Sequence, residues 1–144
     1  MSGDRQPPAA VATEFNIGID VEEVARFASL PDDTTMRGMF TPEELEYCAG
    51  FFDAPARYAG TWCAKEAAIK ALWPWARLDP RRVAVTRTED GRPLVLISGW
   101  DQAEEQVSIR VSISHSTSVA SACAIAWGPP GFVLDTVDPG DRHG

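Results

Sequence analysis

Glu66 is the residue of this sequence that is best placed to do chemistry, because the helix predicted around it is otherwise apolar on that side. Residues 62–72 are rich in Ala, Lys, Glu and Leu and contain no Pro or Gly, which favours a helix. The side that carries Glu66 is made of Ala59, Trp62, Cys63, Ile69 and Trp73. A carboxylate is costly to bury unless a cation pairs with it or it binds a metal. Glu66 is therefore a candidate metal ligand, and the alternative is a helix ion pair with Lys70, four positions on.

Asp20 is the second candidate carboxylate, at the end of an alternating stretch. Residues 15–20 predict a strand whose core-facing row is Phe15, Ile17 and Ile19. A helix is expected over residues 21–29, and Asp20 with Glu23 matches a helix capping box. A capping carboxylate keeps one oxygen free, so Asp20 can serve the helix and a site together.

His115 continues the apolar row of a predicted strand over residues 107–115, a row made of Val107, Ile109, Val111 and Ile113. A lone histidine in that position is more often structural than a ligand. A thiol dyad of His115 with Cys63 has no support, because Cys63 lies on the buried side of the predicted helix.

Several further elements must position these residues. The segment TPEE at 41–44 is a strong helix start, and that helix is expected to end at Gly50. The central helix is expected from about Asp53 to Leu72 or Trp73, where Pro74 ends it. The second half predicts a hairpin (82–87 and 93–97), a short polar helix (101–105) and strands at 107–115 and 119–127.

Length and composition indicate one globular domain. The chain has 144 residues, enough for a single core, and carries 13 basic against 21 acidic residues for a net charge of −8. That charge argues against a nucleic-acid partner. No apolar run is long enough for a membrane span, no signal-peptide pattern opens the chain, and three cysteines lack metal-type spacing, so a cytoplasmic location is expected. Residues 1–13 are expected to be disordered, 14–128 to form the domain, and 129–144 to be a mobile acidic tail.

Five motifs in order then match a known family. They are GIDVEEVARF (18–27), FTPEE (40–44), WCAKEA (62–67), GRP (91–93) and VSISHS (111–116). Together they resemble the holo-acyl-carrier-protein synthase type of 4′-phosphopantetheinyl transferase, over about residues 15–127. Such enzymes move the phosphopantetheine arm of coenzyme A onto a serine of an acyl carrier protein and release adenosine 3′,5′-bisphosphate. The resemblance implies an α+β fold with helices packed on an antiparallel sheet, of the short, single-unit type that forms homotrimers with sites between subunits.

The resemblance also implies roles for individual residues. Asp20 and Glu66 match the acids that hold Mg²⁺, and with Lys70 they form the expected catalytic group. Lys65 and Lys70 correspond to lysines near the pyrophosphate. Pro93 corresponds to an adenine-side contact and His115 to the position near the 3′-phosphate. The base that takes the serine proton is open: a metal-bound water and the carboxylates of Glu22, Glu23 or Glu66 all qualify.

Arg26 matches an arginine that docks the acidic carrier protein, and Arg37 is expected to extend that patch. The carrier can belong to fatty-acid, polyketide or peptide synthesis.

Two departures from the family lie where coenzyme A is expected. The family commonly has an arginine for the phosphates five residues before the metal-binding glutamate, where this chain has Thr61, and Arg57 one turn earlier is the candidate substitute. A Gly-rich turn after the central helix is replaced by Trp73-Pro74-Trp75. The chain is therefore predicted to be an Mg²⁺-dependent transferase, and the alternative is a module that binds a carrier protein or a nucleotide without turnover.

Overall fold

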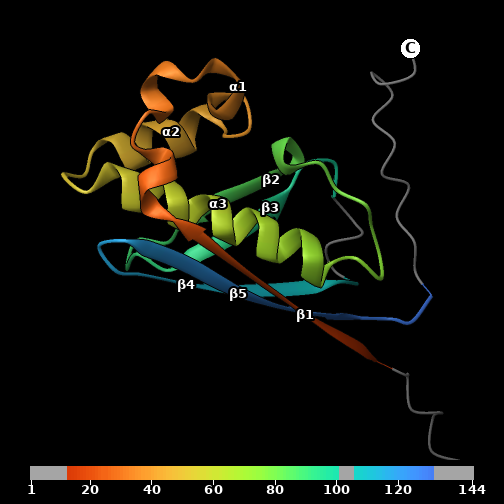
Figure 1. Ribbon diagram of the computed structural model, residues 1–144. Coiled ribbons are helices and arrows are strands. Elements are labelled where there is room, and N and C mark those ends of the chain that lie inside the picture. The colour runs from red at the N-terminus through yellow and green to blue at the C-terminus, as the bar shows by residue number, and fades with distance from the viewer. Residues whose placement is uncertain (1–12, 101–105, 132–144) are drawn as a thin grey trace, which may run out of the picture.

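The computed structural model describes residues 13–100 and 106–131. These residues form three α-helices and five strands, shown in Figure 1. The helices are α1 (Thr34–Arg37), α2 (Pro42–Ala49) and α3 (Ala54–Ala71). The strands are β1 (Glu14–Glu23), β2 (Val83–Arg87), β3 (Pro93–Ile97), β4 (Ser108–His115) and β5 (Val119–Gly128). Short 3₁₀ turns cover Val24–Phe27, Leu30–Asp32 and Pro80–Arg82.

Helix α3 lies across one face of an antiparallel sheet with the strand order β1-β5-β4, while β2 and β3 form a separate hairpin (Figure 1). The close packing depends on small side chains on both layers. Four alanines of β5 that face the helix are buried, and α3 presents alanines in return: Ala120, Ala122, Ala124 and Ala126 on the strand, and Ala59, Ala64, Ala67, Ala68 and Ala71 on the helix. The predicted α+β class, with helices packed on an antiparallel sheet, is confirmed.

Gly18 sets how closely β1 approaches α3. A Cβ atom at this position would lie 2.1 Å from the Ala67 carbonyl oxygen and 2.8 Å from the Ala71 nitrogen, both backbone atoms that cannot move aside. Next to it, the Asn16 Nδ2 donates hydrogen bonds of 3.0 and 3.1 Å to the carbonyl oxygens of Lys70 and Ala71. These contacts hold β1 against the C-terminal half of the helix and bring Asp20 to it.

The face of β1 that packs on α3 is the opposite of the predicted one. Phe15, Ile17 and Ile19 are 64%, 70% and 67% exposed, so the prediction that they line the core is wrong. Gly18 and its small or polar neighbours take the core side because only they permit the backbone approach that α3 makes. The apolar row of β1 therefore forms an open face of the sheet.

The chain after Asp20 also differs from its prediction. Strand β1 continues to Glu23, paired with Val119 of β5, and only a short 3₁₀ turn, Val24–Phe27, follows it. The expected helix over residues 21–29 and its capping box are therefore wrong. The local capping signal is overridden because ten residues of β1 find partners on β5.

The other elements agree with the sequence, apart from small shifts of their bounds. The side chain of Thr41 caps α2 in a capping box with Glu44, and α3 ends at Ala71 just before Pro74. Strands β2 and β3 form the expected hairpin, with Gly91 in its turn at φ 88°. The polar helix expected at 101–105 and almost all of the two expected tails lie outside the described residues. Within the described residues, no helix is long and apolar enough to cross a membrane.

Candidate active site

An open acidic group lies where β1 crosses α3. The Lys70 ammonium group donates to the Ile19 carbonyl oxygen at 2.9 Å and lies 3.3 Å from Oδ1 of Asp20. The other carboxylate oxygen of Asp20, Oδ2, is buried and has no hydrogen-bond partner. Buried polar atoms are nearly always paired, so an orphaned carboxylate oxygen points to a missing ligand.

The electrostatics of Glu66 link it to the same group. Burial raises the pKa of the Glu66 carboxyl above its ordinary value, and the charge of Asp20 raises it further, while Lys70 opposes the change. Burial, together with the charges of Asp20 and Glu22, raises the pKa of the Cys63 thiol to about 12. A thiol held protonated in this way is no nucleophile, which agrees with the rejection of a thiol dyad.

The donor set fits a hard cation. Mg²⁺ prefers oxygen ligands and commonly takes one or two carboxylates, with water and phosphate oxygens completing its shell. Within the described residues no group of three or more His, Cys, Asp or Glu side chains is arranged to hold a metal. Asp20, with its orphaned oxygen, and Glu66, whose proton affinity the Asp20 charge raises, are therefore the residues that would hold Mg²⁺ here.

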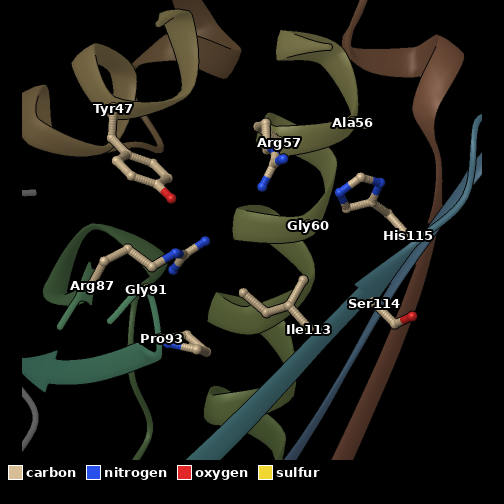
Figure 2. A pocket seen from close by; sticks show the side chains of 10 residues that line it. All are labelled: Tyr47, Ala56, Arg57, Gly60, Arg87, Gly91, Pro93, Ile113, Ser114 and His115. Atoms are coloured by element: carbon tan, nitrogen blue, oxygen red, sulfur yellow. The ribbon is translucent and has the colours of Figure 1, made fainter. Parts of the chain in front are cut away.

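A second feature on α3, nearer its N-terminus, is a pocket of about 330 Å³. Figure 2 shows Arg57 on α3 and Arg87 at the end of β2 pointing into the same space, with Tyr47 beside them and Pro93 below. Gly60 lets Ile113 of β4 pack directly on the helix, because a Cβ atom at this position would lie only 2.9 Å from the Ile113 side chain. The lining residues are Tyr47, Ala56, Arg57, Gly60, Arg87, Gly91, Pro93, Ile113, Ser114 and His115.

The structure brings most of the predicted residues together in these two places. Asp20 and Lys70 are in contact, and their charges act on Glu66. Arg57, Pro93 and His115, predicted from separate parts of the chain, line one pocket.

The two residues predicted for carrier docking lie elsewhere. Arg26 is in the 3₁₀ turn after β1 and pairs with Glu22 at 2.8 Å. Arg37 is the last residue of α1.

Lys65 is not part of either place, which corrects the expectation that it lies near the pyrophosphate. Its side chain is 0% exposed, and its ammonium group donates to Oε1 of Glu44 at 2.7 Å and to the Val83 carbonyl oxygen at 2.6 Å. The other oxygen of Glu44 accepts from the Val85 amide at 2.7 Å. The pair ties α2, α3 and β2 together and leaves Lys65 out of a ligand's reach.

Packing explains Thr61 and Trp75, which belong to the two departures noted in the sequence, whereas Trp73 is half exposed. Thr61 is 2% exposed, and its hydroxyl lies 3.5 Å from the sulfur of Cys48, so it faces the interior. Trp75 is fully buried, and its indole nitrogen donates to the Pro129 carbonyl oxygen at 2.9 Å. Neither side chain lines the arginine pocket.

Two pocket residues, Arg87 and Tyr47, were missed by the sequence analysis. The signal for Arg87 was the hairpin, since Arg87 pairs across the ladder with Pro93, which the sequence already placed at the ligand. Tyr47 packs its ring 5.0 Å from the Arg87 guanidinium carbon and had no signal of its own.

The acid pair and the pocket together indicate the kind of ligand that this fold binds. An acid pair suited to a hard cation and a pocket with two arginines lie along one helix, on an α+β scaffold. That combination suits a ligand with separate phosphate groups, because a hard cation bridges phosphate oxygens and arginines bind phosphate directly.

Comparison with known proteins identifies the family. Residues 16–126 match the family model of the 4′-phosphopantetheinyl transferase superfamily. The chain belongs to this superfamily, and the resemblance drawn from its motifs is confirmed.

Three similar proteins illustrate the relationship. The holo-[acyl-carrier-protein] synthase of Caldicellulosiruptor saccharolyticus is 37% identical over 119 residues, which cover 78% of this chain and 95% of that protein. The structure of a holo-(acyl-carrier-protein) synthase from Bacillus anthracis in complex with CoA (3′,5′-ADP) has a TM-score of 0.67 and 26% identity, covering 81% of this chain and 99% of that one. Fatty acid synthase subunit alpha of Candida parapsilosis is 31% identical over 117 residues, 76% of this chain, but the chain spans only 6% of that subunit.

Proposed function

We propose that this chain transfers the 4′-phosphopantetheine group of coenzyme A to a serine of an acyl carrier protein. In this reaction the serine oxygen forms a bond to the pantetheine-bearing phosphorus. The bond from that phosphorus to adenosine 3′,5′-bisphosphate breaks, and the serine proton is released. The observation that carries the proposal is the buried, unpartnered Oδ2 of Asp20 beside a Glu66 carboxyl of raised pKa. The names of full-length relatives agree with it, since the chain covers 95% of one holo-[acyl-carrier-protein] synthase.

In this proposal, one group of residues binds at the pyrophosphate of coenzyme A and another binds its nucleotide. Asp20 and Glu66 would hold Mg²⁺, which supplies compensation for the charge that develops on the departing phosphate. Lys70 stands beside Asp20 and adds a positive charge on the pyrophosphate side. Arg57, Pro93 and His115 line the pocket that receives the nucleotide. Arg26 and Arg37 serve the acidic carrier protein.

A binding module without turnover has less support than it had from the sequence. The two features that favoured it were Thr61 and the Trp73-Pro74-Trp75 segment. Thr61 and Trp75 are buried in the interior, and the half-exposed Trp73 is not among the residues that line the pocket, so none of the three weakens the pocket from within. The acid pair is intact, which is what turnover requires.

A homotrimer is part of the proposal, and the open face of the sheet supports association. The exposed apolar residues of β1 and β5 on this face are Phe15, Ile17, Ile19, Val21, Val119 and Ile125. A contiguous apolar face of this kind commonly marks a protein–protein contact. The number of three copies rests on the family, as does the placing of sites between subunits. We also propose a cytoplasmic location, in keeping with three free cysteines.

The test is a mass measurement on a purified apo carrier protein incubated with the chain, coenzyme A and Mg²⁺. We expect the carrier to gain the mass of one phosphopantetheine group. Glu66→Ala should keep its fold by circular dichroism and lose the transfer by roughly a hundredfold or more, as expected when a main electrostatic contributor is removed. A chain that binds coenzyme A but never modifies apo carriers from fatty-acid, polyketide and peptide pathways would be a binding module instead.

A further inference from the structure

The hairpin β2–β3 is attached to the rest of the protein by few polar contacts. Its strands pair with each other and not with the sheet β1-β5-β4 (Figure 1). Among the described residues, two hydrogen bonds join residues 83–97 to other elements, and both end on one ion pair, formed by Glu44 of α2 and Lys65 of α3. This pair is therefore the polar attachment of the hairpin.

The ion pair binds the free edge of β2. The Lys65 ammonium group donates to the Val83 carbonyl oxygen at 2.6 Å, and Oε2 of Glu44 accepts from the Val85 amide at 2.7 Å. Alternate residues of a strand direct their N–H and C=O groups to the same side, where a neighbouring strand normally pairs with them. Side chains of two helices thus supply the hydrogen bonds that a neighbouring strand would supply.

Three donors converge on the Glu44 carboxylate. Oε1 accepts from the Lys65 ammonium group and from the Thr41 amide, both at 2.7 Å, and Oε2 accepts from the Val85 amide. The side chains of Glu44 and Lys65 are 1% and 0% exposed, so these bonds are shielded from water. A neutral amide in place of the carboxylate would turn its NH₂ group toward at least one of the donors. Glu44 is therefore an anchor shared by α2, α3 and β2, and it requires the carboxylate.

The elements that meet at this pair also form walls of the pocket of about 330 Å³. Figure 2 shows Tyr47 from α2, Arg57 and Gly60 from α3, and Arg87 and Pro93 from the hairpin around one space. A shift of the hairpin against α3 would move the last two residues relative to the other three. The pocket therefore keeps its shape only if the hairpin keeps its position.

The distances along the chain from the pair to the pocket are short. Tyr47 follows Glu44 by three residues, so the two lie on adjacent turns of α2. Arg87 follows Val85 by two residues, or about 7 Å along β2. The ring of Tyr47 lies 5.0 Å from the Arg87 guanidinium carbon. A change at the ion pair therefore reaches the pocket through one short segment of each element.

We infer that Glu44, held by Lys65, is a positioning residue that fixes the β2–β3 hairpin against α3 and so sets the geometry of the nucleotide pocket. This inference rests on the proposed function, which places the nucleotide of coenzyme A in that pocket. It gives the buried pair a role in ligand binding besides its contribution to stability.

The experiment uses two variants at this pair, Glu44→Gln and the double variant Glu44→Met with Lys65→Met. Calorimetric titration with adenosine 3′,5′-bisphosphate measures the pocket without a carrier protein, at a temperature where near-UV circular dichroism shows each variant folded. Denaturant midpoints measure stability. The control is Leu30→Ala, a fully buried position in the 3₁₀ turn Leu30–Asp32, where a cavity destabilises the core without touching the hairpin's attachment.

Both Glu44 variants should bind the bisphosphate about tenfold or more weakly, because small misplacements of binding groups carry large penalties. Leu30→Ala should bind it within about twofold of the parent, despite its lower denaturant midpoint. The double variant should regain part of the midpoint lost in Glu44→Gln, since it leaves no unpaired charge inside, but it should not regain affinity. In turnover, the KM for coenzyme A should rise while kcat stays within about threefold, because the pocket binds the part of the ligand that does not react.

A purely structural pair would give the opposite pattern. Affinity that returns with the denaturant midpoint in the double variant, or an equal loss of affinity in Leu30→Ala and Glu44→Gln, would overturn the inference. Hydrogen exchange supplies a readout without ligand: the Val85 amide should exchange at least about tenfold faster in Glu44→Gln than in Leu30→Ala, since only the first loses its bond partner. Equal exchange in the two variants would also overturn the inference.

These measurements separate the inference from the proposed function. If the Glu44 variants lose the bisphosphate as expected but the parent chain modifies no carrier, the transferase assignment fails while the role of Glu44 stands. If transfer occurs and the Glu44 variants bind the bisphosphate as the parent does, the transferase assignment stands and the role of Glu44 fails. A parent chain that does not bind the bisphosphate would overturn the role of Glu44.

Discussion

Two lysines of helix α3 pair with carboxylates of other elements, Lys65 with Glu44 and Lys70 with Asp20. The surroundings of the two pairs are opposite. Lys65 and Glu44 are enclosed, with side chains 0% and 1% exposed, and both oxygens of Glu44 accept hydrogen bonds. Lys70 and Asp20 lie 3.3 Å apart at the surface, and one oxygen of Asp20 has no partner. The Lys65–Glu44 pair, with its carboxylate oxygens hydrogen-bonded, stabilises the fold. The Lys70–Asp20 pair keeps one carboxylate oxygen that can bind a ligand.

The difference shows why neighbouring charged residues in one motif need not share a role. Lys65 and Glu66 are adjacent in the sequence, but successive residues of a helix point about 100° apart. Lys65 points to α2 and the hairpin, and Glu66 shares the surroundings of Asp20 on β1. Breaking each pair in turn should therefore produce different kinds of defect.

The largest effect is expected from Lys65→Met, which leaves the Glu44 carboxylate buried without its cation. Removing one partner of a buried pair costs about 3–5 kcal/mol of unfolding free energy. Lys70→Met, at the exposed pair, should cost no more than about 1 kcal/mol. Denaturant unfolding followed by circular dichroism measures both. Equal losses in the two variants would remove the structural distinction between the pairs.

A smaller effect is expected from Asp20→Asn, and only when Mg²⁺ is present. Asp20 caps no helix, and its Oδ2 is orphaned, so the variant should match the parent chain in stability without metal. A metal that binds only the folded state adds about 2.7 kcal/mol at a hundred times its Kd, and the variant should lose most of this gain. Thermal melts with MgCl₂ and with NaCl of equal ionic strength show the difference.

Asp90→Asn is the control for that measurement, because Asp90 is an exposed carboxylate in the hairpin turn. It should keep the full stabilisation by Mg²⁺. A metal response that survives in Asp20→Asn as well as in the control would place the cation elsewhere.

The smallest effect is expected in the pH dependence of stability, measured with a chelator present. Burial and the Asp20 charge raise the pKa of Glu66 above its ordinary value of 4.5, so the folded state keeps a proton that the unfolded state releases. The folded chain therefore loses stability as pH rises from about 4.5 through the folded-state pKa. Glu66→Gln carries no charge there, so it should be more stable than the parent at neutral pH, with the gap closing toward pH 4.5.

Glu46→Gln, at an exposed position of α2, serves as the reference for that pH series. If the stability of Glu66→Gln depends on pH in the same way as that of Glu46→Gln, burial and the Asp20 charge do not raise the pKa of Glu66.

Much of the fold was predictable because its signals are local. The cap at Thr41, the length of the helix before Pro74 and the hairpin around Gly91 follow from short-range chemistry, and the structure has all three. The family and the acid pair also came from the sequence, since Asp20 and Glu66 lie in motifs of fixed order. What alternation does not reveal is which face of a strand is buried, since either face of β1 satisfies a period of two.

The sequence by itself therefore determined most of the helices and strands, the family and the candidate carboxylates of this protein. Only the tertiary structure decided that β1 turns Gly18 rather than Ile17 toward α3, because the two backbones approach too closely for a side chain. It also separated Lys65 from Glu66, and it brought Arg87 to Arg57 across a pocket. These outcomes depend on contacts between residues distant in the chain, and no local pattern encodes them.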